Sequence, residues 1–269
     1  MDTGYNYFMK YTIFLLVAIF FSGCVWQKVE SQPITQNPNS EIQNPKSKSP
    51  VLVELFTSEG CSSCPPADRA LTFLEKQQPN SDAEIITLSL HVTYWDDLGW
   101  KDKFSSMLFT QRQELYSQRF NLDSIYTPQM VIDGNYELVG SDLTRAQKLI
   151  SESAKNQKAK VEITNTDNKL KIKVSEIPTH KDATVYLAIV EDNLISNVGN
   201  GENSGKKLEH NSVVHTLQSI GSINSQNGEY EGEYALQLQA NWKKRDLKII
   251  AFVQENNSRK ILGVNSFHY

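Results

Sequence analysis

Cys61 and Cys64 lie three residues apart in the stretch TSEGCSSCPPAD, which spans residues 57–68. Two cysteines at this spacing can form a redox-active disulfide, hold a metal ion or act as a structural crosslink. No second CxxC or Cys/His pair is present to complete a four-ligand structural zinc site. Redox exchange, soft-metal binding and a structural disulfide therefore stay open.

The cysteines precede a predicted helix at residues 64–78, which begins with two prolines that fit only its first turn. The free N–H groups and the dipole at the start of a helix stabilise a thiolate, so we expect Cys61 to be the nucleophile. Cys64, one turn later, would resolve a mixed disulfide at Cys61.

His91 ends a predicted buried strand at residues 83–92, on the same edge as the cysteines. It could tune Cys61, or it could be a buried structural histidine. It could also join both sulfurs as a third ligand for copper(I) or zinc. A copper-binding or copper-delivery protein that uses Cys61, Cys64 and His91 is therefore the alternative to a redox protein, which would need no cofactor.

The elements that must position these residues can be predicted for residues 51–157. Continuous apolar runs at 51–57 and 83–92 are typical of strands buried on both faces, and the helix between them favours a parallel pair. A second helix over about 103–120, with Phe104, Leu108 and Leu115 on one face, comes next. A hairpin with an Asp133-Gly134 turn and a helix capped by Ser141 or Asp142 complete a βαβαββα order.

The pattern changes near residue 158. Seven short segments with period-two alternation and no helical signal follow, between Ala159 and the C-terminus. The sequence therefore predicts an α/β domain at 51–157 and an all-β sandwich domain at 158–269.

The N-terminal residues predict export. An apolar run from Tyr11 to Phe21 follows Lys10 and ends in Phe-Ser-Gly-Cys at Cys24, similar to the lipidation site of bacterial lipoproteins, and translation from Met9 would make this leader more compact. We therefore expect a lipoprotein-type signal peptide at 1–24, with a plain secretory leader or a short membrane anchor as the alternatives. A disordered tether is expected at 25–50. The protein would be lipid-anchored at a bacterial membrane, facing the periplasm or the cell exterior, and only Cys61 and Cys64 would be left to pair.

Thr127-Pro128, placed just before the third predicted strand, makes the chain resemble the thioredoxin superfamily, in which a cis-proline faces the cysteines. The stretches VELFTSEGCSSCPPAD, HVTYWDDLGWKDKF, YTPQMVIDG and VGSD are more closely similar to a thioredoxin-like secreted bacterial family known as domain of unknown function 1223. The resemblance runs from about Val51 to Tyr269. It implies a cis Pro128 and a Thr127 backbone free to pair with an extended substrate, but no established substrate.

One position departs from the superfamily. Thioredoxins place a proton-accepting acid six residues before the first cysteine, where this chain has Leu55, and Glu54 lies seven before. Glu54 could fill that role through a one-residue bulge, or it could pair with a neighbouring base.

Other polar and aromatic residues have less specific patterns. Trp95 and Trp100 either form a peptide groove or pack beneath their loop. Arg112 is expected on a solvated helix face. His210, in a polar loop that could dock on the first domain, is expected to be an ordinary surface residue.

Composition limits the class of partner. The chain is 39% hydrophobic and 22% charged, with a net charge of −4, so it has no concentrated positive field for nucleic acid. The sequence thus predicts thiol–disulfide exchange with cysteine-containing exported proteins or a redox partner. Copper(I) binding and a non-catalytic binding module with a structural disulfide are the alternatives.

Overall fold

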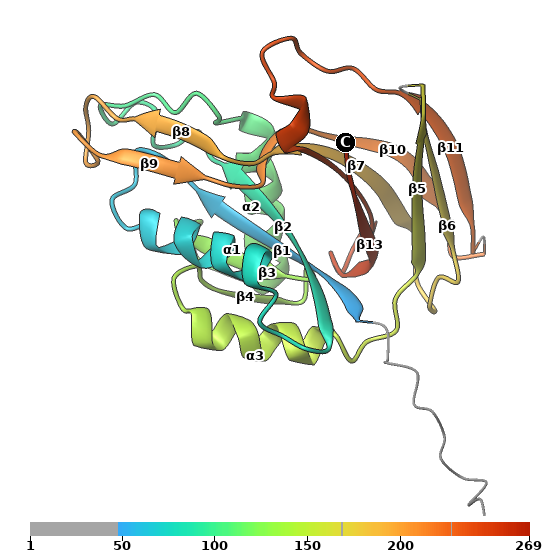
Figure 1. Cartoon of the computed structure of the whole chain (residues 1–269). Coiled ribbons are helices and arrows are strands. Elements are labelled where there is room, and N and C mark those ends of the chain that lie inside the picture. Colours follow the sequence, from blue (N-terminus) through green and yellow to red (C-terminus); the bar gives the residue numbers. More distant parts are fainter. Residues whose placement is uncertain (1–47, 168, 227) are drawn as a thin grey trace, which may run out of the picture. The chain divides into compact units, whose positions relative to one another are not determined.

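The computed structural model describes residues 48–167, 169–226 and 228–269. Within them the chain forms an eight-stranded mixed sheet, a three-stranded sheet, a two-stranded hairpin and three α-helices (Figure 1). The strands therefore dominate the fold.

The first elements in chain order are β1 (Ser49–Thr57), α1 (Pro65–Gln77), β2 (Ala83–His91), α2 (Met107–Phe120), β3 (Gln129–Ile132), β4 (Tyr136–Val139) and α3 (Leu143–Ser153). They are followed by β5 (Lys160–Thr166), β6 (Lys169–Ser175), β7 (Ala183–Glu191), β8 (Leu194–Asn197), β9 (Lys207–His210), β10 (Val213–Ile223), β11 (Tyr230–Ala235), the 3-10 turn η1 (Lys244–Asp246), β12 (Leu247–Glu255) and β13 (Ile261–His268).

The large sheet has the strand order β13-β12-β7-β10-β2-β1-β3-β4. β1 pairs in parallel with β2 along its whole length, from Ser49↔Ala83 to Thr57↔His91. β10 joins the other edge of β2 in parallel at Val213↔Ser89, next to a hydrogen bond from Ser89 N–H to the Ser212 carbonyl. This short junction connects the strands of both halves of the chain.

The predicted fold class, a thioredoxin-like βαβαββα domain followed by a β-sandwich, is wrong. β7, β10, β12 and β13 extend the sheet that contains β1 to β4, instead of forming a sandwich of their own. β12 is buried at every position but its last, which fits a strand inside a sheet covered on both faces. Alternation in the sequence indicates strands but not their partners, because pairing across so many residues is decided by which sheet edge needs covering.

The boundary predicted between residues 157 and 158 falls in the connection between α3 and β5, and it stays a prediction. The expected signal peptide, Cys24 and residues 25–47 of the tether lie outside the described residues. β1 begins at Ser49, so it includes the last two residues assigned to the tether. Among the described residues, no helix has both the length and the apolar content to cross a membrane.

The buried face of α2 differs from the predicted one. Leu108 and Leu115 are exposed, whereas Phe109, Arg112 and Tyr116 are buried. The expectation that Arg112 lies on a solvated face is therefore wrong. An apolar pattern could not reveal this face because its central residue is a charged side chain with a buried partner.

The hairpin and the last helix agree with the sequence. β3 pairs with β4 around a turn in which Asp133 and Gly134 have φ values of 51° and 65°. A glycine tolerates this conformation without strain. Asp142 caps α3, where its carboxylate accepts a hydrogen bond from the N–H of Arg145 at 3.0 Å.

Candidate functional site

Cys61 and Cys64 form a disulfide at the start of α1, with their Cα atoms 5.4 Å apart. Cys64 is the residue that precedes the first helical turn, and Pro65 opens that turn. The hydroxyl of Ser63 lies 3.3 Å from Cys61 Sγ, where it can donate a hydrogen bond to a thiolate. Both cysteines have 0% exposed surface, although Ser62 and Ser63 between them are exposed.

The loop between β8 and β9 is hydrogen-bonded to the backbone of the cysteine loop. The side-chain amide of Asn203 donates hydrogen bonds to the backbone carbonyls of Glu59 at 2.8 Å and Cys61 at 2.9 Å. The carboxylate of Glu202 accepts a hydrogen bond from Ser62 N–H at 3.0 Å. Figure 1 shows the β8–β9 hairpin beside the N-terminal end of α1. The contact between this loop and the cysteine loop, which the sequence left open, is therefore present.

Trp95 links the cysteine loop to the Thr127-Pro128 bond, which is cis. Its indole N–H donates to the Thr127 hydroxyl at 2.8 Å, and its Cβ lies 3.2 Å from where a Cβ on Gly60 would stand. The Pro128 carbonyl accepts a hydrogen bond from Gly140 N–H at 2.9 Å. Trp95 is half-buried, so it packs beneath its loop instead of standing free on the surface.

The close approach at Gly140 brings the proline segment to α1. A Cβ at this position would lie 3.0 Å from the Ala67 Cβ and 3.3 Å from the Pro128 Cβ. Ala67 is in the first turn after Cys64. The cis-proline segment and the cysteine-bearing end of α1 therefore lie on the two sides of Gly140, and only a glycine fits between them without displacing either.

Four buried side chains, Glu59, His91, Asp102 and His210, form a cluster behind the cysteine loop. His91 Nδ1 lies 2.6 Å from Asp102 Oδ2, which also accepts the N–H of Glu59 at 2.9 Å. Glu59 Oε1 lies 3.4 Å from His210 Nε2, and Glu59 Oε2 accepts the indole N–H of Trp100 at 2.7 Å. The rings of His91 and His210 are 5.0 Å apart at an angle of 75°. The expectation that His210 is an ordinary surface residue is therefore wrong.

Burial and ion pairing shift the pKa values of this cluster in opposite directions. Burial alone would raise the pKa of Asp102, but the charge and hydrogen bond of His91 hold that pKa at about 2. Burial alone would lower the pKa of His91, yet the Asp102 carboxylate raises it. Desolvation opposes ionisation of Glu59 as well, but its contact with His210 leaves its pKa lowered. The cluster thus favours charged carboxylates beside an imidazolium.

Glu54 lies on β1 and pairs with a base. Its carboxylate accepts hydrogen bonds from Arg112 Nε at 2.5 Å and Arg112 Nη2 at 3.0 Å, and from the Tyr116 hydroxyl at 2.5 Å. Glu54 and Arg112 are both buried. The ion pair that the sequence offered as one interpretation of Glu54 is present, and its proposed part in proton transfer stays a prediction.

The copper(I) alternative also stays a prediction. Asp102 lies 2.6 Å from Nδ1 of His91, whereas the buried Nε2 of His91 has no hydrogen-bond partner among the described residues. Among the residues described, no three His, Cys, Asp or Glu side chains are arranged so that they could hold a metal ion. The predicted ligand set concerns two reduced thiols, and both sulfurs are in a disulfide here.

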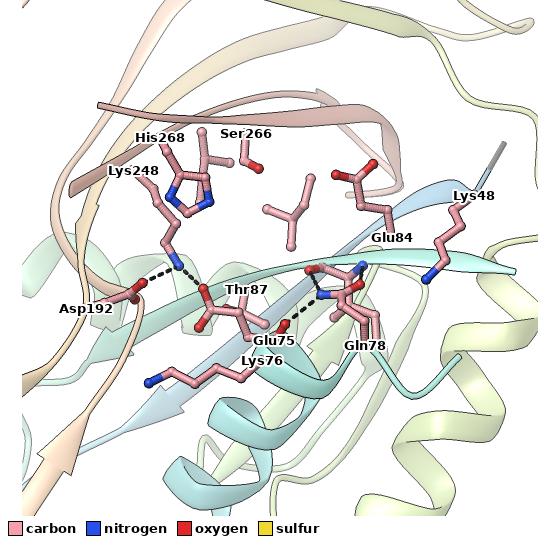
Figure 2. Close-up of a pocket in the computed structure, with 13 residues that line it drawn as sticks. Lys48, Glu75, Lys76, Gln78, Glu84, Thr87, Asp192, Lys248, Ser266 and His268 are labelled. Atoms are coloured by element: carbon pink, nitrogen blue, oxygen red, sulfur yellow. Dashed lines mark hydrogen bonds and ion pairs between the residues drawn. The ribbon is translucent and has the colours of Figure 1, made fainter. Parts of the chain in front are cut away.

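A separate cavity of about 540 Å³ lies at the other end of α1 (Figure 2). The Lys248 ammonium contacts the carboxylates of Glu75 and Asp192, the latter at 3.0 Å. The side-chain amide of Gln78 makes two 2.8 Å hydrogen bonds with the backbone N–H and carbonyl of Ile85, on the part of β2 that β10 does not reach. Glu75 is eleven residues after Cys64, or ~16 Å along a helix, so this cavity is not part of the cysteine site.

The family described as "Protein of unknown function (DUF1223)" matches residues 52–254. The chain belongs to this family. The matched residues include both cysteines, the cis-proline segment and the β8–β9 loop that is hydrogen-bonded to the cysteine loop. The resemblance to DUF1223 is confirmed, whereas membership of the thioredoxin superfamily is not. No curated protein matches the chain.

Solved structures show that the fold occurs elsewhere. Protein AGR_C_4864 from Agrobacterium tumefaciens is 24% identical, with a TM-score of 0.65 over 81% of this chain and 93% of that chain. A domain of the outer membrane lipoprotein Omp28 from Porphyromonas gingivalis is 17% identical, with a TM-score of 0.23 over 41% of this chain and 86% of that chain. The first match shows a shared fold, and the second is too distant to support any inference.

The sequence found the cysteines and the cis-proline but missed most of the surrounding cluster. Glu59 lies two residues before Cys61, in a turn where no strand or helix pattern marks a residue as buried. Asp102 was one of several acids in a loop. Asn203 lies about 140 residues and His210 about 150 residues after the cysteine loop, so only the three-dimensional contact identifies them.

Proposed function

We propose that this DUF1223 protein exchanges thiols and disulfides with cysteine-containing partner proteins through Cys61 and Cys64. The observation that carries the proposal is the Cys61–Cys64 disulfide at the start of α1, with the Ser63 hydroxyl on the Cys61 sulfur. A helix start and a hydroxyl donor both lower the pKa of a nearby thiol. Cys61 is the nucleophile and Cys64 the resolving thiol.

The burial of both cysteines supports a reaction in which a loop must open before exchange can occur. A partner thiolate must reach a sulfur in line with the S–S bond, and both cysteines are fully buried. The contacts that Asn203 and Glu202 make with residues 59–62 would have to open before a protein thiol could reach Cys61. Small reductants would therefore react faster than protein thiols of the same pKa.

The cellular setting follows from the N-terminal sequence and is part of the proposal. Export and acylation at Cys24 would tether the protein to a bacterial membrane, facing the periplasm or cell exterior. Disulfides persist in such compartments. Its partners would be other exported proteins with cysteines or a redox partner.

A redox titration tests the exchange. The protein is equilibrated with glutathione buffers of graded ratio, its free thiols are alkylated, and the reduced fraction is read from the mass shift. We expect a reversible two-electron transition and catalysed reduction of an added protein disulfide. Cys61→Ser should abolish catalysis, whereas Ser225→Ala, at an exposed position outside the cysteine loop and the β8–β9 loop, should leave it intact. A disulfide that glutathione does not reduce, or catalysis that survives Cys61→Ser, would overturn the proposal.

A further inference from the structure

Opening the Cys61–Cys64 bond leaves a negative charge on a buried sulfur, and a proton is needed to neutralise it. Attack on Cys61 Sγ releases the bonding electron pair on Cys64 Sγ as a thiolate. Cys64 has 0% exposed surface, and an unpaired thiolate without water is destabilised by burial. A proton donor on the Cys64 side would remove this charge.

Asp68 is one helical turn after Cys64. The N–H of Asp68 donates to the Cys64 carbonyl at 3.1 Å, so both residues belong to the same turn of α1. Side chains four residues apart on a helix lie on one face, with Cβ atoms about 5–6 Å apart. Helical side chains also lean toward the N-terminus, which directs the Asp68 carboxyl toward Cys64.

A hydrogen bond from β1 fixes this carboxyl. The Thr57 hydroxyl donates to Asp68 Oδ1 at 2.9 Å. Thr57 is itself four residues before Cys61. Asp68 is therefore held between the strand that leads into the cysteine loop and the helix that follows it.

Asp68 also borders a route to solvent. A pocket of about 170 Å³ is lined by Asp68, Arg69, Lys207 and Glu209, among others. This volume is large enough to hold water. Asp68, at 8% exposure, thus stands between the fully buried Cys64 and a pocket that can supply protons.

The environment of Asp68 suits a proton carrier. Burial raises its pKa, against the opposing charges of His210 and His91 and the hydrogen bond from Thr57, while the charge of Asp102 acts in the same direction as burial. The other acids behind the cysteine loop differ, because pairing with histidines lowers the pKa of both Glu59 and Asp102. Both oxygens of Glu54 are engaged by Arg112.

We infer that Asp68 donates the proton that Cys64 takes up when the disulfide opens, an inference that rests on the proposed exchange reaction. A partner thiolate attacks Cys61 Sγ, a mixed disulfide forms, and the S–S bond breaks. The electron pair moves to Cys64 Sγ, the Asp68 proton transfers to it, and water in the pocket reprotonates Asp68. A second partner thiolate then takes the partner sulfur, leaving Cys61 as a thiolate that solvent protonates. In the reverse direction Asp68 accepts the Cys64 proton.

The test is the pH profile of disulfide reduction in Asp68→Asn. The amide keeps an oxygen for the Thr57 hydroxyl but carries no acidic proton. The rate constant for reduction by dithiothreitol, normalised to its thiolate fraction, should fall in the wild type as pH rises through the pKa of Asp68. In Asp68→Asn it should be about 100-fold lower below that pKa and independent of pH. Glu114→Gln, which removes an exposed acid on α2 outside this pocket, should keep the wild-type rate and profile. A wild-type rate and profile in Asp68→Asn would overturn the inference.

A second measurement separates this inference from the proposed function. If thiols fail to reduce the wild-type disulfide, the proposed function is lost, and the Cys64 thiol can be titrated in Cys61→Ser by its thiolate absorbance. A neighbouring carboxylate disfavours the thiolate, so Asp68→Asn should lower the pKa of Cys64. An unchanged Cys64 pKa would overturn the placement of Asp68 beside that sulfur.

Discussion

The side-chain amide of Asn203 donates a hydrogen bond to the backbone carbonyl of Cys61 at 2.9 Å, from 142 residues further along the chain. A second hydrogen bond from the same amide reaches the Glu59 carbonyl at 2.8 Å. Asn203 has 0% exposure. The β8–β9 loop is therefore anchored on the backbone that carries the nucleophile, and its opening must break both bonds.

Asn203→Ala should accelerate reduction of the disulfide. Each hydrogen bond contributes about 0.5–1.5 kcal/mol, so losing two should make the open state roughly tenfold more populated or more. Stopped-flow reduction by a small protein dithiol measures this effect. Ser204→Ala is the matched control, because its hydroxyl bonds only to the Gly199 carbonyl within the loop. Equal rates for wild type and Asn203→Ala would show that the loop is no barrier.

Two tryptophans near the site should differ in their contribution to stability. Trp100 donates its indole N–H to the buried carboxylate of Glu59, whereas Trp95 donates to the hydroxyl of Thr127. Bonds to charged groups contribute about 1.5–3 kcal/mol, against about 1 kcal/mol for neutral ones. Urea denaturation of Trp100→Phe should therefore show the greater loss of unfolding free energy. A greater loss in Trp95→Phe would contradict this description of Glu59.

The His91–Asp102 pair should make stability depend on pH. The folded-state pKa of His91 is raised by Asp102. The contribution of protonated His91 to the free energy of unfolding is therefore fully present below its unfolded pKa of about 6.5. That contribution is lost as pH rises through the raised folded pKa. The Asp102 pKa is lowered to about 2, so its contribution is present above the unfolded value and is lost as pH falls through about 2.

Urea denaturation tests this pH dependence. The unfolding free energies of the wild type and His91→Gln are measured between pH 5 and 9. The difference between them should shrink as pH rises. His180→Gln is the control, since that ring contacts the carbonyls of Pro178 and Asn224 and no carboxylate. A difference that grows with pH would mean that His91 is neutral in the folded protein.

The sequence predicted local structure better than assembly. The cysteine turn, the Asp133-Gly134 hairpin and the Asp142 cap depend on residues close in the chain, so their chemistry was visible in short stretches. The eight-stranded sheet depends on the pairing of Val213 with Ser89, which neither strand's pattern encodes. The same limit applies to the site, where Glu59 and His210 meet only because the β8–β9 hairpin returns to the cysteine loop.

Glu54 and Arg112 provide the last test, since they distinguish a structural ion pair from a catalytic acid. Arg112→Met would leave the buried Glu54 carboxylate unpaired and should cost about 3–5 kcal/mol of unfolding free energy. Arg119→Met is the control, because the guanidinium of Arg119 is exposed and bonds to the Ser258 carbonyl. The double variant Arg112→Met/Glu54→Gln removes both charges, so its cost should be well below the sum of the single costs.

The exchange rate of Glu54→Gln, taken per folded molecule, decides the catalytic interpretation of Glu54. With both oxygens held by Arg112 and one also by Tyr116, Glu54 has no oxygen free to take a proton from Cys64. We expect a rate within about twofold of the wild type, since proton transfer by a positioned acid contributes about 100-fold or more. A loss of that size in Glu54→Gln, with normal rates in Asp68→Asn, would transfer the proton-carrying role to Glu54.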